Sequence, residues 1–156
     1  MTIRNFEKKD ENEVKAIFSL YWTDPEFLKE LADELLLHLN DQTSKDQKFF
    51  VAEERGEVLG IAGLKKIPDY LKSFSVTTDP VELYIIAVKD KGRGIGKQLK
   101  SKLIEEAKNN GFSEILLFSP NTHNESWPFH DTLGFERVGE VIPPEDEVGQ
   151  VWRKII

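Results

Sequence analysis

The amino-acid sequence predicts a single domain of the α/β (α+β) class over residues 1–156, in which helices cover a mixed β-sheet. The chain has 156 residues, of which 39% are hydrophobic, and this is enough for one substantial core but not for two. Segments with strand periodicity alternate with segments of helical periodicity along the whole chain. In addition, one buried strand runs directly into a glycine-rich turn and a helix. Together these three observations predict the fold class.

The N-terminal part is predicted to form a short strand and two helices. Thr2–Phe6 is the strand, and Asp10-Glu11-Asn12-Glu13 reads as a capping box that opens the first helix. Asp24 and Pro25 open the second helix as its cap and its first residue. The apolar residues of the two helices recur at helical spacing, at Val14, Ile17, Phe18 and Tyr21 and then at Leu28, Leu31, Leu35 and Leu39.

The rest of the chain is predicted to alternate between strands and helices. The remaining strands are expected over Phe49–Glu54, Val58–Leu64, Val81–Val88, Ile115–Phe118, Glu136–Ile142 and Gln150–Ile155. The first two form a hairpin through Arg55-Gly56, whereas Ile67–Pro80 looks irregular. A short helix is expected around Ser126–Leu133 and ends at Gly134. The predicted order is β-α-α-β-β-β-α-β-α-β-β.

A glycine-rich turn follows the strand Val81–Val88 and is the most informative local pattern. The turn reads Lys91-Gly92-Arg93-Gly94-Ile95-Gly96, and the helix after it carries Ile95, Leu99, Leu103 and Ala107 on one face before Gly111 ends it. Free N–H groups and the dipole at a helix start favour phosphate binding. Glycines let the backbone approach the ligand closely. The alternative is a tight turn that binds nothing.

Two common phosphate-binding motifs do not fit this turn. A P-loop needs a lysine followed by Ser or Thr, whereas Lys97 is followed by Gln98. The dinucleotide-binding fingerprint needs a third glycine at the position that Lys97 occupies. Both motifs are therefore disfavoured.

The segments Glu82–Val88 and Lys91–Leu99 together resemble the acetyl-CoA motif of the GNAT superfamily of N-acetyltransferases. The family pattern is Gln or Arg, two residues, Gly, one residue, then Gly or Ala. Gly94 and Gly96 match it, while Lys91 stands where Gln or Arg is usual. The resemblance covers the whole chain, including the family's last helix, to which 124–135 is similar. It implies a mixed, mostly antiparallel sheet of about six or seven strands with about four helices.

The resemblance implies acetyl-CoA as cosubstrate, with no metal. Backbone groups of the strand would pair with the pantetheine arm, provided that this strand diverges from Ile115–Phe118, and one of its N–H groups would polarise the thioester carbonyl. N–H groups of the turn would hold the pyrophosphate. The residues implied for cofactor binding are Ile86, Ala87, Val88, Lys91, Gly92, Arg93, Gly94, Ile95, Gly96, Lys97 and Asn124.

Two residues are implied as the catalytic pair. Glu82 stands where some relatives carry a general base, which takes the proton of the acceptor amine; the alternative is a strand-end glutamate in solvent. His130 stands where many relatives carry a tyrosine that protonates the departing sulfur; the alternative is a half-buried helix histidine. Asn124 either binds the pantetheine or caps the helix. His38 is interpreted as packing or surface, and Trp22 as core or as part of an acceptor wall.

Composition limits the functions that remain. The net charge of −7 argues against general nucleic-acid binding. The absence of cysteine excludes disulfides, thiolate metal sites and a thiol nucleophile, and no apolar run reaches the length of a membrane span. We expect a cytoplasmic monomer or homodimer that acetylates a primary amine, either a small molecule or a peptide, in a ternary complex. The alternatives are a non-catalytic CoA-binding regulatory or interaction module and a nucleotide-binding module.

Overall fold

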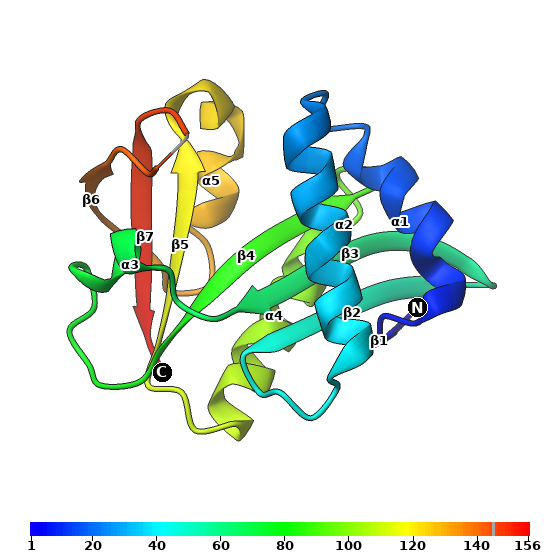
Figure 1. The fold of residues 1–156 in the computed structure, drawn as a ribbon, viewed down its shortest axis with the longest axis horizontal. Helices are drawn as coiled ribbons and strands as arrows, with labels where there is room; N and C mark the ends of the chain where they lie inside the picture. The colour runs from blue at the N-terminus through cyan, green and yellow to red at the C-terminus, as the bar shows by residue number, and fades with distance from the viewer. Residues whose placement is uncertain (145) are drawn as a thin grey trace. The chain divides into compact units, whose positions relative to one another are not determined.

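The computed structural model describes residues 1–144 and 146–156 (Figure 1). The strands are β1 (Thr2–Asn5), β2 (Gln47–Glu54), β3 (Glu57–Lys65), β4 (Pro80–Val88), β5 (Glu114–Pro120), β6 (Glu136–Val141) and β7 (Gly149–Ile155). The α-helices are α1 (Glu11–Phe18), α2 (Pro25–Asn40), α3 (Asp69–Lys72), α4 (Ile95–Asn109) and α5 (Trp127–His130). Short 3₁₀ helices cover Lys8–Asp10 and Asn121–Ser126. The predicted order of strands and longer helices is confirmed.

The strands form one seven-stranded mixed sheet in the order β1-β2-β3-β4-β5-β7-β6. β4 and β5 are parallel, whereas β1 with β2, β5 with β7 and β6 with β7 are antiparallel. This confirms the predicted α/β (α+β) class. The chain divides into two compact units, Met1–Leu64 with Ile85–Leu103 and Lys65–Tyr84 with Ile104–Ile156, so that β4 and α4 each contribute to both. The prediction of a single domain stays a prediction.

In the first unit, helices cover both faces of β2 and β3 (Figure 1). The rings of His38 on α2 and Phe49 on β2 are 6.0 Å apart, so α2 covers the face that Phe49 presents. Phe50 points to the opposite face, where the Nζ atom of Lys102 on α4 lies 5.4 Å from its ring centre. An added Cβ at Gly60 would lie 2.9 Å from Leu99 Cδ1, so glycine allows α4 to approach β3 closely.

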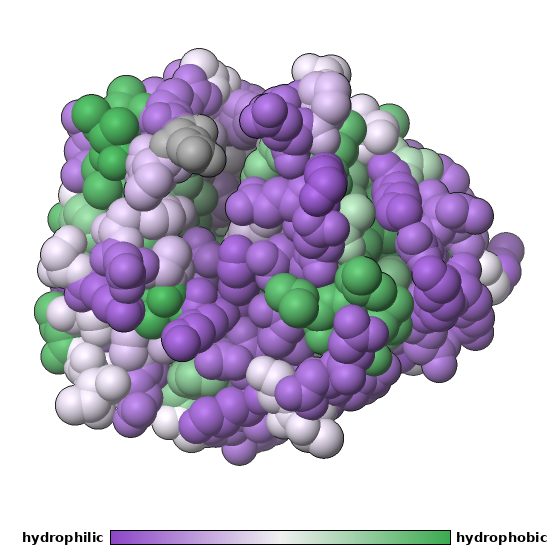
Figure 2. All heavy atoms as spheres, in the orientation of Figure 1, coloured by the Kyte–Doolittle hydropathy of each residue, from purple (hydrophilic) through white to green (hydrophobic). Residues whose placement is uncertain are grey.

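Helix α2 carries apolar side chains outside its buried stripe. Its cap and first residue are those predicted, with the carboxylate of Asp24 accepting a hydrogen bond from Glu26 N. Leu31 and Leu35 of the predicted stripe are buried. Leu36 and Leu37, however, are 51% and 53% exposed, and Figure 2 shows a hydrophobic patch over the C-terminal half of this helix.

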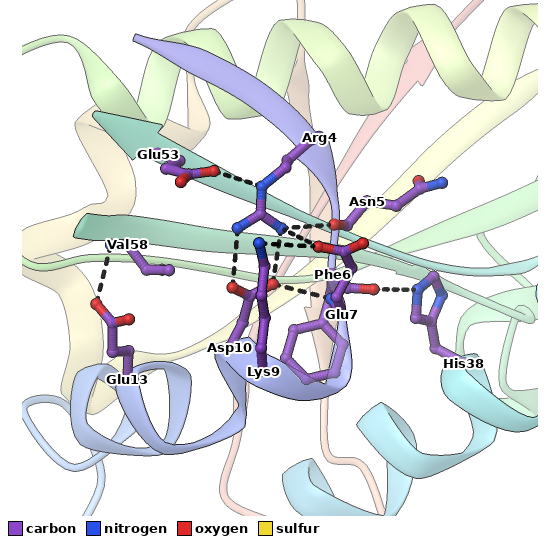
Figure 3. Close-up of polar contacts among 10 residues, drawn as sticks. All are labelled: Arg4, Asn5, Phe6, Glu7, Lys9, Asp10, Glu13, His38, Glu53 and Val58. Carbon is purple, nitrogen blue, oxygen red and sulfur yellow. Dashed lines mark hydrogen bonds and ion pairs between the residues drawn. The ribbon is translucent and has the colours of Figure 1, made fainter. Parts of the chain in front are cut away.

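The predicted capping box at the start of α1 is wrong, because its first and last residues, Asp10 and Glu13, have partners elsewhere (Figure 3). Asp10 accepts two hydrogen bonds from Arg4 of β1, at 2.8 and 2.9 Å, and one from Glu7 N at 2.9 Å. Burial alone would raise the pKa of the Asp10 carboxyl, but these donors hold that pKa below its usual range. Glu13 accepts a hydrogen bond from Val58 N at 3.0 Å. Both acids therefore tie the N-terminus of the chain to the sheet.

In the second unit, the segment around α3 and the helix α5 contact opposite faces of β5 and β7. Leu71 of α3 packs with Leu116 and Val151, and all three are buried. Trp152, the next residue along β7, points to the other face, where its ring centre lies 5.8 Å from that of Trp127 on α5. The alternation of side chains along a strand explains this division.

The segment Ile67–Pro80, predicted to be irregular, contains α3 and a loop that is anchored to the start of β5. The fully buried carboxylate of Glu114 accepts hydrogen bonds from Val76 N at 3.1 Å and from the N and Oγ1 atoms of Thr77 at 2.9 and 2.7 Å. Ser75 Oγ also donates to it. Burial raises the pKa of Glu114, but the donors outweigh it and lower this pKa overall.

The predicted helix around Ser126–Leu133 is shorter than expected. α5 comprises only Trp127–His130 and is preceded by a 3₁₀ helix. Leu133 and Gly134 both have positive φ, at 60° and 83°. The left-handed conformation at Gly134 agrees with the predicted glycine stop. No helix within 1–144 and 146–156 combines the length and the apolar character that crossing a membrane requires.

Candidate functional site

The start of α4 has the geometry of an anion-binding site. The first intrahelical hydrogen bond runs from Gln98 N to Gly94 O at 3.1 Å. The N–H groups of the residues between them are those that helix geometry leaves without an intrahelical acceptor. Helix α4 has 15 residues, so its dipole adds positive potential at this end. The local backbone can therefore bind a phosphate group.

The glycines of the turn leave this backbone uncovered. Gly92 and Gly94 have φ of 84° and 75°, a conformation that other residues rarely adopt. An added Cβ at either position would meet no atom within 4 Å. The two glycines are thus required by backbone conformation and not by packing. A ligand could approach the N–H groups here without displacing a side chain.

The basic side chains of the turn already have partners in the first unit. Arg93 Nη2 lies 2.8 Å from Glu54 Oε2 on β2, and this ion pair raises the pKa of Arg93. Lys91 Nζ lies 5.3 Å from the ring centre of Tyr21. Lys97, in the first turn of α4, is exposed. Glu54 is a residue that sequence reasoning missed, since only the hairpin fold brings it to the turn.

The strand end before the turn lies beyond the ladder that joins β4 to β5. Pairing between these strands covers Pro80–Glu82 with Glu114–Leu116. Ile86 and Val88, two of the predicted cofactor-binding residues, follow that ladder and are half-buried, whereas Ala87 is buried. The carbonyl oxygen of Val88 accepts a hydrogen bond from the Tyr21 hydroxyl at 2.6 Å, a contact that sequence reasoning also missed. Burial raises the pKa of Tyr21.

Glu82 is a buried residue of the second unit. Only 6% of it is exposed, so the alternative interpretation of a strand-end glutamate in solvent is wrong. It pairs in register with Leu116 of β5 and shares a face of β4 with Tyr84. Buried acids are uncommon, which makes Glu82 a candidate for a functional role.

His130 closes α5 and is held from two sides. Its Nε2 atom lies 3.2 Å from the hydroxyl of Ser126, one helical turn earlier. Its ring centre lies 5.0 Å from that of Trp152, whose indole N–H donates to Asp131 at 2.8 Å. Helical spacing of Ser126 and His130 in the sequence could have indicated their contact.

Asn124 does not cap α5, so that alternative is wrong. It is exposed within the 3₁₀ helix Asn121–Ser126, and its carbonyl oxygen accepts from the N–H of Trp127. Ser126 occupies the cap position of α5 and makes no side-chain capping bond. The other role predicted for Asn124, binding the pantetheine, stays a prediction.

His38 is a packing residue between α2 and the sheet. His38 is 1% exposed and lies between Phe6 and Phe49, which agrees with the packing role expected for it. Trp22 packs among Phe18, Tyr21 and Phe27. In the part of the chain that the structure describes, no three His, Asp or Glu side chains gather as a metal site would require.

Comparison with known proteins agrees with this geometry. The pattern of the acetyltransferase (GNAT) family matches residues 14–135, well over half of the chain. The chain therefore belongs to the GNAT acetyltransferase family, whose members use acetyl-CoA as cosubstrate.

Curated relatives match over part of their length. Human N-acetyltransferase 8B is 27% identical over 94 residues, which are 59% of this chain and 40% of that protein. Zebrafish (Danio rerio) N-acetylaspartate synthetase is 32% identical over 94 residues, covering 59% of this chain and 30% of that protein. The chain thus spans less than half the length of these relatives.

Solved structures share the fold over the whole chain. A GNAT-family protein from Desulfovibrio desulfuricans has a TM-score of 0.82 at 17% identity and covers 99% of this chain and 98% of its own. The protein yncA from Salmonella typhimurium, solved with acetyl-CoA, has a TM-score of 0.74 at 21% identity, with coverage of 99% and 93%. An aminoglycoside 6'-N-acetyltransferase complexed with coenzyme A has a TM-score of 0.74 at 17% identity, with coverage of 99% and 97%.

Proposed function

We propose that this chain transfers the acetyl group of acetyl-CoA to a primary amine by direct attack in a ternary complex. The observation that carries the proposal is the uncovered start of α4, where Gly92 and Gly94 leave the N–H groups open to a ligand. Membership of the GNAT family supports acetyl-CoA as that ligand.

Binding of the pyrophosphate would rest on the backbone from Arg93 to Lys97. Backbone N–H groups at a helix start satisfy phosphate oxygens without help from a basic side chain. Arg93 is already paired with Glu54, so its guanidinium would add little attraction for the pyrophosphate. This agrees with binding mainly by the backbone. The pantetheine would add to the end of β4 at Ile86 and Val88, beyond the ladder with β5, and Asn124 would contact it.

The chemistry requires a neutral amine and a stabilised thiolate. We assign the first task to Glu82, acting directly or through water, because it is a buried carboxylate on β4 and a positioned carboxylate can accept the proton of the amine. His130 would supply the proton to the departing sulfur. The amine nitrogen forms the new bond to the acetyl carbon while the bond from that carbon to sulfur breaks. No covalent enzyme intermediate is involved.

The acceptor is assigned only as a primary amine, in a small molecule or a peptide. The names of similar proteins point to different acceptors, namely an aminoglycoside and aspartate. These names describe those proteins, and the walls of the acceptor site carry no motif in this chain.

Two measurements test the proposal. Saturating acetyl-CoA or CoA should raise the melting temperature, since a ligand that binds only the folded state stabilises it, whereas ATP and NAD should not. A panel of amines assayed by release of free CoA should then show turnover. Binding without turnover on any amine would favour the non-catalytic CoA-binding module. No thermal shift with either ligand would refute the cofactor site itself.

A further inference from the structure

Two acids of the β2–β3 hairpin hold two basic side chains at the glycine-rich turn. Glu54 ends β2 and Glu57 begins β3, on either side of the two-residue turn Arg55-Gly56. Glu57 Oε1 lies 2.5 Å from Nζ of Lys89, the residue directly after β4. Glu54 Oε2 lies 2.8 Å from Nη2 of Arg93, within the turn. All four side chains belong to the first unit.

This pairing favours the charged forms of both basic side chains. The hydrogen bond between Arg93 and Glu54 raises the pKa of the guanidinium and lowers the pKa of the carboxyl. The hydrogen bond to Glu57 likewise raises the pKa of Lys89. Asp90 adds a further negative charge, 4.0 Å from Nη1 of Arg93. The positive charge of these two side chains is therefore offset by acids that lie beside them.

We propose that Glu54 and Glu57 limit the affinity of the turn for the phosphates of acetyl-CoA. The proposal rests on the proposed function, which supplies the ligand. A guanidinium binds a carboxylate and a phosphate through the same N–H groups, so Arg93 cannot bind the pyrophosphate fully while it is bound to Glu54. The acids also carry charge of the same sign as the ligand, which repels it. Both effects weaken the binding of acetyl-CoA.

The opposite effect would arise if the two ion pairs were needed to hold the turn in place. Other hydrogen bonds already do this, because Lys89 N donates to Leu59 O at 2.8 Å and the Tyr21 hydroxyl donates to Val88 O at 2.6 Å. The four paired side chains are between 40% and 51% exposed, and exposed ion pairs stabilise a fold little. We therefore expect the charge of the acids, and not their support of the turn, to decide the affinity.

Titration calorimetry of CoA and acetyl-CoA at low salt tests the sign of the effect. Glu54→Gln should bind both ligands roughly two- to fivefold more tightly than the wild type, the effect of one exposed charge pair. The two ligands should gain equally, because they share the same phosphates. Glu57→Gln should change the affinity in the same direction. Asp33→Asn is the matched control, since it removes one negative charge from an exposed ion pair with Lys29 on α2 and should leave the affinity unchanged.

A double variant tests whether the gain comes from the released guanidinium. Arg93→Gln, added to Glu54→Gln, should return the affinity to near the wild-type value, because no released cation is left to attract the phosphates. Salt provides an independent readout. The gain of Glu54→Gln over the wild type should largely disappear at about 1 M salt, where screening reduces the range of charge interactions to about 3 Å.

The same measurements can overturn the proposal. Weaker or unchanged binding of CoA by Glu54→Gln would show that the acid supports the turn or has no influence on it. A gain that persists in the double variant, or that Asp33→Asn also produces, would show that release of Arg93 is not its cause. If the wild type binds CoA but Glu54→Gln gains nothing, only this inference fails. If the wild type binds neither ligand, the proposed cofactor site itself is refuted.

Discussion

The hydroxyl of Tyr21 donates a hydrogen bond of 2.6 Å to the carbonyl oxygen of Val88. This bond joins the segment that follows α1 to the last residue of β4, directly before the glycine turn. Tyr21 also lies under Lys91, a residue of that turn. Tyr21 therefore holds in place the end of β4 to which we assign the pantetheine, and both belong to the same unit.

Tyr21→Phe should remove the hydrogen bond to Val88 while it keeps the aromatic ring next to Lys91. We expect a loss of about 1 kcal/mol in the free energy of unfolding, the usual net value of one hydrogen bond, measured by urea titration. Acetyl-CoA should bind several-fold more weakly by calorimetry, because the Val88 backbone is less well ordered. Wild-type stability together with wild-type affinity would show that the hydroxyl does not brace the strand.

Gly94→Asp should abolish the thermal shift that acetyl-CoA produces, since it places a negative charge where the pyrophosphate is expected. The backbone strain of the substitution must be separated from this effect, because φ is 75° at Gly94. Gly56→Asp is a matched control: its φ is 79°, and its Cβ would also meet no atom within 4 Å. Each variant should be destabilised by about 1–2 kcal/mol. If acetyl-CoA raises the melting temperature of Gly94→Asp as much as that of Gly56→Asp, the turn does not bind the pyrophosphate.

The parts of the fold that follow from periodicity could be predicted from the sequence, and the parts that follow from long-range contacts could not. The stripe on α4 identified its buried face, since Ile95, Leu99 and Leu103 are all buried. The pattern from Asp10 to Glu13 looks like a capping box locally. Only the folded chain shows that Arg4 and Val58 take those carboxylates instead.

The candidate site also contains residues that could be predicted from the sequence and residues that could not. Its glycines could be found because positive φ and open backbone restrict the residue type at a single position. The contact between Tyr21 and Val88 joins residues 67 positions apart, and nothing in either segment marks it. Helix α3 has only four residues, which is too short for a helical period to be recognised.

Stability should decline as the pH falls below about 6.5, because of His38. Burial lowers the pKa of this histidine below its ordinary value of 6.5, although Gln47 and Phe6 carbonyls oppose the shift. The unfolded chain then binds a proton that the folded chain does not, so the stabilisation is complete above 6.5 and is lost as the pH falls towards the folded pKa. Urea unfolding at pH 7.5, 6.5 and 5.5 measures how the free energy of unfolding changes with pH. His38→Gln should make this dependence on pH weaker. If the free energy of unfolding depends on pH equally in the wild type and in His38→Gln, His38 is not the cause of the pH dependence.

Glu82→Gln should lower turnover by about 10²-fold and leave acetyl-CoA affinity nearly unchanged. The amide matches the carboxylate in size, so the buried site at the start of β4 should stay intact, but it cannot take the amine proton. Steady-state rates from pH 6 to 9, with affinity from thermal shifts, test the prediction. A variant as fast as the wild type across that range removes Glu82 from the mechanism.

His130→Phe and His130→Tyr together test the acid. The phenylalanine retains the packing on Trp152 but has no proton to give, so turnover should fall by roughly 10²-fold or more. The tyrosine supplies a hydroxyl donor at similar reach and should retain much of the activity. His130→Phe also loses the bond to Ser126, so a loss of melting temperature in that variant reports that bond and not catalysis. If the phenylalanine variant is fully active, His130 serves only to pack α5 against β7, and the thiolate takes its proton from water.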